Sequence, residues 1–166
     1  AAGVLMIGHA HMGGFGSIEG VAAAKAEIIA GLLPEGTAIL NADDARCAAM
    51  AELAPARVLT FSAQGDSADL RAENVVVDET ARAAFDLHLP GLDAPRRVQL
   101  AVAGAHNVAN ALAAAGLALA AGLEPELIAE RLGSVSIESP HRMDVSELSG
   151  DLLLIDDSYN ANIDSM

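Results

Sequence analysis

Short apolar runs separated by polar or glycine-rich segments mark the first part of the chain. The runs at residues 4–7, 37–40 and 57–61 predict buried strands. Longer segments between them predict helices over residues 18–30 and 45–53. A strand, a polar loop and a helix in this order begin a parallel α/β unit, in which ligands bind beyond the carboxyl ends of the strands. The pattern therefore predicts an α/β fold.

The first long helix is expected to begin after Ser17, an N-cap residue type, and to end before Gly31. At about 100° per residue its apolar side chains form one stripe. These are Ile18, Val21, Ala22, Ile28 and Ile29. Lys25 falls inside the stripe, which predicts that it faces the core, and it is the only lysine beside eight arginines.

Two explanations of Lys25 remain open from the residues alone. Its stem could cover apolar surface while its ammonium stays in water or pairs with Glu27. Alternatively, burial could favour the neutral amine, which can be chemically modified as a guanidinium cannot.

Alternation of apolar and polar residues begins again after residue 69. Segments 75–77, 84–89 and 97–102 predict a small antiparallel sheet, with turns at Pro90-Gly91 and Ala94-Pro95. His88 lies in an alternating strand and is expected at the surface rather than as a ligand.

The last third of the chain predicts two helices and then two strands. An alanine-rich helix should open at Gly104 and run to about Ala121, and a second should start at Pro125 and end at Gly133. Strands are expected over 143–148 and 152–155. We place a domain boundary near Pro140, which divides the chain into residues 1–139 and 140–166.

Polar side chains follow several of these predicted elements. Asp43 and Asp44 come after the strand at 37–40, where they could cap the next helix or line a ligand pocket. Asn107 and Asn110 are three residues apart and share a face of the first helical turn. One of them could cap the helix while the other is solvated, or the amide pair could bind a polar ligand edge at the positive helix end.

The composition and net charge of the chain argue against some classes of binding partner. The formal net charge of −14 argues against nucleic acid or an anionic membrane surface as the main partner. The apolar run at 111–123 is too short and glycine-broken for membrane insertion. The single Cys47 excludes an internal disulfide and is typical of a cytoplasmic protein.

Five motifs occur in an order and spacing that resemble the Mur ligase family of peptidoglycan synthesis. They are A-H-x-G-x-F-G-S-x-E-x-x-A-x-A-K-x-E-I at 10–28, N-A-D-D at 41–44, G-x-H-N-x-x-N at 104–110, R-M at 142–143 and D-D-S-Y-N-A-N at 156–162. The last motif is the most discriminating, because sister ligases carry other residues after the aspartate.

The resemblance implies a fold and a reaction. The fold is part of a P-loop-type mononucleotide-binding central domain with a small antiparallel sheet, followed by the first strands of a Rossmann-like C-terminal domain. The reaction is ATP-dependent addition of D-alanyl-D-alanine to UDP-MurNAc-tripeptide through an acyl phosphate, with Mg²⁺ neutralising phosphate charge.

The resemblance also implies roles for particular residues. His11 would be a magnesium ligand, and Lys25 would become a second ligand after carbamylation by carbon dioxide. The nucleotide would be bound by Asn107, Asn110, Arg142 and Asp157, and Tyr159 and Asn160 would lie near the substrates.

Some features depart from the family pattern. Met6 stands where an asparagine is usual, and Ile163 where proline is usual. No G-x-x-x-x-G-K-[ST] motif occurs, so we expect an internal piece of the enzyme that is inactive in isolation.

Two other interpretations stay open. One is another amide ligase, either a different Mur ligase or a folylpolyglutamate synthase. The other is a non-catalytic binding domain without a P-loop. The upstream gene sequence would distinguish them.

Overall fold

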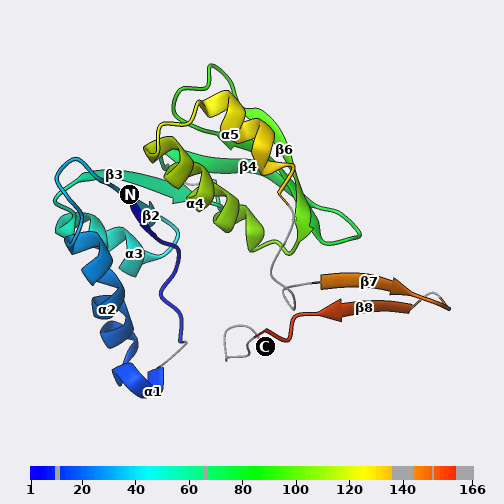
Figure 1. Ribbon diagram of the computed structural model, residues 1–166, viewed down its shortest axis with the longest axis horizontal. Coiled ribbons are helices and arrows are strands. Elements are labelled where there is room, and N and C mark those ends of the chain that lie inside the picture. Colours follow the sequence, from blue (N-terminus) through cyan, green and yellow to red (C-terminus); the bar gives the residue numbers. More distant parts are fainter. Residues whose placement is uncertain (10–11, 66, 136–143, 151, 160–166) are drawn as a thin grey trace.

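Six strands form one continuous sheet in the computed structural model, which describes residues 1–9, 12–65, 67–135, 144–150 and 152–159 (Figure 1). The strands follow one another in chain order across the sheet. They are β1 (Ala2–Val4), β2 (Thr37–Asn41), β3 (Arg57–Ser62), β4 (Leu70–Val77), β5 (Arg82–His88) and β6 (Arg96–Ala103). The pairs from β1 to β4 are parallel, and those from β4 to β6 are antiparallel.

The observed strands confirm the predicted α/β class and change one part of it. The expected small antiparallel sheet is not separate, because β4 pairs in parallel with β3 through Phe61 and Leu70. The first strand also begins and ends earlier than predicted, at Ala2 and Val4. Only three of its residues pair with β2, and residues 5–7 lie beyond the paired part.

Helices cover both faces of the parallel part. They are α1 (Met12–Phe15), α2 (Ile18–Ala30), α3 (Ala45–Ala49) with the 3₁₀ turn η1 (Met50–Leu53), α4 (Asn107–Ala120) and α5 (Pro125–Leu132). Successive side chains of β2 point to opposite faces. Ala38 and Leu40 pack in the cluster of α2 and α3, whereas Ile39 packs in the cluster of α4 and α5.

Helix α4 lies very close to β2. A Cβ atom added to Gly116 would lie 2.8 Å from Cγ2 of Ile39, so this helix position requires glycine. The close approach buries Leu112 completely against the sheet. Helix α4 therefore holds its first residue, Asn107, in a fixed relation to the strands.

Helix α2 has the predicted bounds but not the predicted buried face. The Ser17 hydroxyl accepts a hydrogen bond from the Gly20 amide at 3.1 Å, which confirms the N-cap. The buried residues are Val21, Ala26 and Ile29. Ile28 is 56% exposed and Lys25 is also exposed, so the prediction that Lys25 faces the core is wrong. The apolar stripe read from the sequence is therefore wider than the face of α2 that is buried.

The antiparallel part has one covered and one open face. Phe85 and Leu87 of β5 are fully buried towards α4 and α5. Asp86 and His88 alternate with them on the other face, which carries polar side chains.

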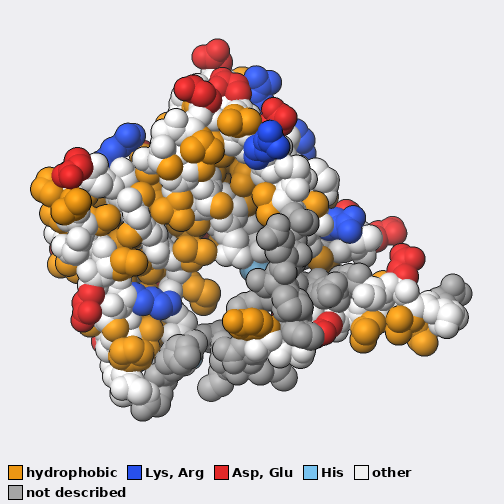
Figure 2. Space-filling view, in the orientation of Figure 1, with side chains coloured by type: hydrophobic (Ala, Val, Ile, Leu, Met, Phe, Trp, Pro, Cys, Tyr) orange, Lys and Arg blue, Asp and Glu red, His pale blue; other side chains and the backbone are white. Residues whose placement is uncertain are grey.

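A second, two-stranded sheet follows. It consists of β7 (Asp144–Leu148) and β8 (Leu152–Asp156), within a residue of the predicted strands. Leu152, Leu153 and Leu154 are each at least half exposed, so β8 exposes apolar side chains on both faces. Figure 2 shows apolar side chains at the surface of the β7–β8 hairpin on the face in view. The predicted linker at 139–143 lies outside the described residues.

Replacing Leu112 tests the packing of α4. We expect Leu112→Ala to lower the free energy of unfolding by about 2–5 kcal/mol, because it leaves a cavity between α4 and the sheet. Leu117→Ala on the same helix is the control, because Leu117 is 36% exposed and should cost roughly 1 kcal/mol. Urea denaturation measures both, and equal costs would contradict the described packing.

Candidate functional site

The carboxyl ends of the parallel strands β1, β2 and β3 bring three chain segments to one edge of the sheet. Residues 5–7 follow β1, residues 41–44 end and follow β2, and residues 62–63 end and follow β3. Backbone groups beyond a strand end lack ladder partners and must find others. At this edge the partners are mostly side chains.

Asn41 and Asp44 hold the chain that leaves β1. The Asn41 Nδ2 atom donates to the carbonyl oxygen of Leu5 at 2.7 Å. The Asp44 Oδ2 atom accepts from the amide of Ile7 at 2.7 Å. Asn41 is only 8% exposed, and its Oδ1 atom accepts from the Asp43 amide at 2.9 Å, which fixes the orientation of its amide.

Asp43 and Asp44 were both candidates to cap the helix after β2, and their hydrogen bonds show that Asp44 is the cap. Asp44 is the N-cap of α3, where Oδ1 accepts from the amides of Arg46 and Cys47. Asp43 accepts from the Ser62 hydroxyl at 2.6 Å and from the Ala63 amide at 2.7 Å. Both carboxylates therefore join segments of this edge.

The surroundings of Asp44 shift two pKa values. Desolvation raises the pKa of Asp44, but the hydrogen bonds it accepts from backbone amides, that of Ile7 above all, outweigh this effect and keep its pKa below the ordinary value. Burial, helped by the nearby Asp44 charge, raises the pKa of the Cys47 thiol to about 12. Cys47 is therefore a buried thiol without nucleophilic character.

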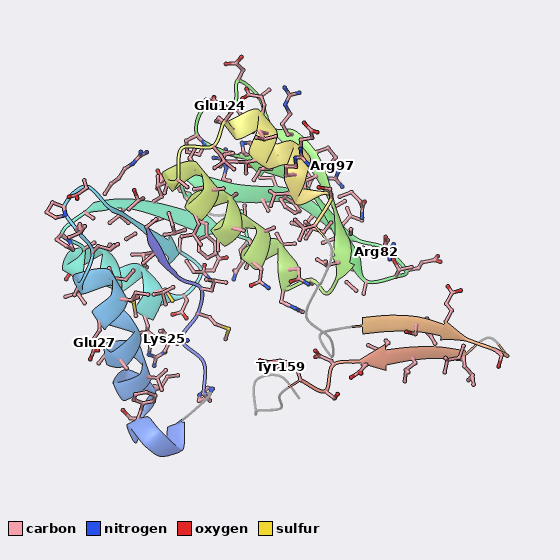
Figure 3. All side chains as sticks on the ribbon, in the orientation of Figure 1. Lys25, Glu27, Arg82, Arg97, Glu124 and Tyr159 are labelled. Atoms are coloured by element: carbon pink, nitrogen blue, oxygen red, sulfur yellow. The ribbon has the colours of Figure 1, made fainter. Side chains whose placement is uncertain are left out.

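Lys25 reaches the same edge from α2. Its Nζ atom donates to the carbonyl oxygen of Met6 at 2.8 Å. Figure 3 shows Lys25 on the side of α2 next to the chain after β1, with Glu27 on the other side of the helix. The suggested pairing with Glu27 is therefore replaced by a backbone contact. Lys25 is exposed, so the burial that was expected to favour a neutral amine is not observed.

Asn107 and Asn110 share the first turn of α4, as predicted. The Asn107 Nδ2 atom donates to the Ala103 carbonyl at 2.7 Å, and the Asn110 Nδ2 atom donates to Asn107 Oδ1 at 2.9 Å. Asn107 is half-buried and Asn110 is exposed. The bond to Ala103 ties the pair to the end of β6 and leaves Asn110 accessible to a ligand.

The other predicted site residues fall in two groups. Asp157 and Tyr159 follow β8, and Tyr159 is 59% exposed (Figure 3). His11, Arg142 and Asn160 lie outside the described residues. Among the residues that are described, no three His, Cys, Asp or Glu side chains are grouped to hold a metal ion.

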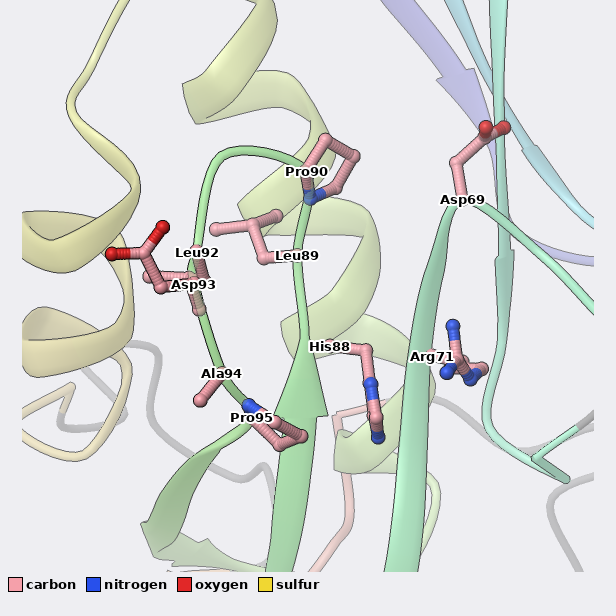
Figure 4. A pocket seen from close by; sticks show the side chains of 9 residues that line it. All are labelled: Asp69, Arg71, His88, Leu89, Pro90, Leu92, Asp93, Ala94 and Pro95. Carbon is pink, nitrogen blue, oxygen red and sulfur yellow. The ribbon is translucent and has the colours of Figure 1, made fainter.

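A hollow of about 250 Å³ lies elsewhere, at the start of β4 and the loop after β5 (Figure 4). Its polar lining includes Arg71 and His88. The Arg71 Nε atom forms an ion pair with Glu73 Oε1 at 2.9 Å, and the His88 Nε2 atom lies 3.0 Å from Glu73 Oε2. No predicted site residue lines this hollow, and we assign the candidate site to the carboxyl edge of β1–β3.

The profile of the Mur ligase middle domain matches residues 1–118. The chain belongs to the Mur ligase family.

Individual Mur ligases show how far this similarity extends. The UDP-N-acetylmuramoyl-tripeptide–D-alanyl-D-alanine ligase of Mycobacterium tuberculosis is 45% identical over 163 residues, which cover 98% of this chain and 31% of that protein. The Escherichia coli ligase of the same name is 39% identical and covers 95% of this chain and 34% of that protein. A crystal structure of MurF from Acinetobacter baumannii matches with a TM-score of 0.86 and 37% identity, over 96% of this chain and 34% of that one.

This Mur ligase chain therefore spans about a third of the length of the curated relatives it matches. The TM-score supports the mixed α/β fold with its curled parallel and antiparallel sheet. Within the described helices, none is long and apolar enough to cross a membrane.

Sequence reasoning about this Mur ligase missed the role of Asn41. The motif N-A-D-D at a strand end was the available signal, because an amide and two carboxylates there can satisfy neighbouring backbone groups. Which backbone groups they reach depends on contacts 36 and 37 residues apart in sequence.

The lowered pKa of Asp44 predicts a pH-dependent contribution to stability. Its ionised form should stabilise the fold at neutral pH, and this contribution should be lost as the pH falls below about 4 and through the lower pKa of the folded state. Asp44→Asn should therefore destabilise the protein more at pH 7 than at pH 3. Urea denaturation at both pH values measures the difference, and a constant difference would contradict the prediction.

Proposed function

We propose that this chain is part of an ATP-dependent ligase that adds D-alanyl-D-alanine to UDP-MurNAc-tripeptide. The observation that carries the proposal is the 45% identity to a ligase of that name over 163 residues, nearly the whole chain. In the reaction, the γ-phosphoryl group of ATP passes to the tripeptide carboxylate and ADP leaves. The amine of D-alanyl-D-alanine then attacks the acyl phosphate, and phosphate leaves the tetrahedral intermediate.

Two domains divide this work in our proposal. Residues 1–139 would belong to a P-loop-type mononucleotide-binding central domain, and residues 140–166 would begin a Rossmann-like C-terminal domain. The separate β7–β8 sheet and the exposed leucines of β8 support a boundary between α5 and β7. Arg142, Asp157, Tyr159 and Asn160 would act from the second domain on the nucleotide and the substrates.

Magnesium would be held at the carboxyl edge of β1–β3. The accessible amine of Lys25 fits this role as a carbamate, because carbamylation turns a cation into an oxygen ligand of the type that magnesium prefers. His11 would supply a second ligand. When bound, the ion neutralises charge on the phosphates.

The adenine would be bound at the start of α4. The amides of Asn107 and Asn110 are already linked to each other and to Ala103, so their geometry is set before a nucleotide arrives. An amide group can both donate and accept, which suits an adenine edge.

Assay of the intact ligase tests the proposed function. UDP-MurNAc-tripeptide, D-alanyl-D-alanine, ATP and Mg²⁺ should yield the extended peptide and equimolar phosphate, detected by mass and colorimetry. Nucleotide binding without product would instead favour a binding domain, and product with a different amine would favour another amide ligase.

Replacing the asparagines tests the adenine contact. Asn107→Ala or Asn110→Ala in the intact ligase should weaken ATP binding by about 1 kcal/mol, roughly fivefold in Kd, because one hydrogen bond is lost. Gln99→Ala on the open face of β6 is a control that removes an exposed amide elsewhere. Calorimetry measures Kd, and unchanged affinity in both variants would make the asparagines helix-start residues only.

Lys25 variants separate the carbamate from the contact with Met6. Lys25→Ala in the intact ligase should be nearly inactive and should be partly rescued by added short-chain carboxylates, which replace the missing anion. Lys25→Arg should be inactive and not rescued, because a guanidinium can donate to Met6 but remains a cation. Product formation with and without formate or acetate measures both, with the wild type in the same salt as control. Full activity of Lys25→Arg would show that the backbone contact is what matters.

A further inference from the structure

Three consecutive residues after β1 are each held through one backbone atom by a different side chain. Residues 5–7 contact Asn41 at the end of β2, Lys25 in α2 and Asp44 at the N-cap of α3. The three distances lie between 2.7 and 2.8 Å. We name these three side chains the strand-end clamp.

The strand-end clamp supplies the hydrogen bonds that hold the backbone of residues 5–7 in place. Strand β1 ends at Val4, so residues 5–7 gain nothing from the sheet ladder. Ile7 is only 6% exposed, and an unpaired amide there would lose its hydration without compensation. Two of the three clamp residues are themselves held by hydrogen bonds. Asn41 accepts from the Asp43 amide, and Asp44 caps α3.

The clamped segment leads directly to His11. Three residues, 8–10, lie between Ile7 and His11 in the sequence, and His11 itself lies outside the described residues. Lys25 contacts the same segment at Met6. Of the two residues proposed as metal ligands, the one that the structure describes is therefore in direct contact with the clamped segment.

We propose that Asn41 and Asp44 are positioning residues of the ligase, which hold residues 5–7 so that Lys25, in contact with Met6, is presented to the magnesium ion. This inference rests on the proposed function. Neither residue touches substrate or metal in it. Groups that orient metal ligands in this way commonly change metal affinity by about 10–100-fold when they are lost.

The neighbouring Asp43 provides a matched control. It belongs to the same N-A-D-D motif and carries the same carboxylate, but it bonds to Ser62 and Ala63 after β3 rather than to residues 5–7. Asp43→Asn removes a charge at this edge and leaves the clamp intact.

Two variants each remove one contact of the strand-end clamp and change little else. Asp44→Ser keeps an N-cap oxygen for α3 but lacks the second oxygen that accepts from Ile7. Asn41→Asp keeps the shape and the acceptor for the Asp43 amide, but it places a carboxylate oxygen against the Leu5 carbonyl in place of a donor.

Hydrogen exchange measures whether Asp44 protects the backbone amide of Ile7. In the intact ligase, mass spectrometry of the peptide that contains Ile7 should show faster exchange in Asp44→Ser than in the wild type or Asp43→Asn. A role limited to capping α3 would be preserved by serine and would leave this exchange unchanged, which would overturn the proposal.

The magnesium dependence of ligation measures the consequence. The Mg²⁺ concentration for half-maximal rate should rise about tenfold or more in Asp44→Ser and Asn41→Asp, while KM for D-alanyl-D-alanine stays within about twofold. Asp43→Asn should keep the wild-type magnesium requirement. Thermal melting confirms that all variants are folded at the assay temperature.

The results distinguish this proposal from the proposed function. A wild-type protein that forms no amide product at any Mg²⁺ concentration overturns the ligase assignment and this inference with it. An active wild type whose clamp variants share the magnesium dependence of Asp43→Asn overturns the positioning role alone. A selective rise in the magnesium requirement supports both.

Discussion

Backbone groups beyond the ends of parallel strands determine how this protein is organised at its candidate site. A parallel strand satisfies its amides and carbonyls only where it has neighbours, and β1 has three paired residues. The chain that follows it is buried at Ile7, so side chains must supply the missing partners. Asn41 and Asp44 do this for β1, and Asp43 does it for the chain after β3. A single four-residue motif thus joins three segments at the edge where α/β proteins bind ligands.

The parallel and antiparallel halves of the sheet differ in how many of their faces are covered by helices. The parallel half is covered on both faces, and the alternation of Ala38, Ile39 and Leu40 between two clusters makes β2 its centre. The antiparallel half is covered on one face by α4 and α5. Because α4 also packs closely on β2 through Gly116, it carries Asn107 on a support shared by both halves. The proposed metal and nucleotide regions therefore lie on one continuous sheet.

Much of the local structure was predictable because it depends on neighbours in sequence. The bounds of α2 follow from Ser17 and Gly31, and the start of α5 follows from Pro125. The pairing of the antiparallel strands with β3 was not predictable, because alternation shows that a strand has two different faces but not which strand lies beside it. Lys25 shows the same limit. Its place in an apolar stripe predicted burial, but the sheet covers only part of that stripe.

Motifs and periodicities are local patterns along the chain, and they were enough to predict the fold class, most of the helices and strands, and the family. What those patterns contact became known from the folded structure. It placed Lys25 on the Met6 carbonyl instead of in the core, and it directed Asn41 and Asp44 to the chain after β1. The reason is physical: a hydrogen bond between groups 19 to 37 residues apart depends on where packing brings their backbones, and no spacing along the chain encodes that distance.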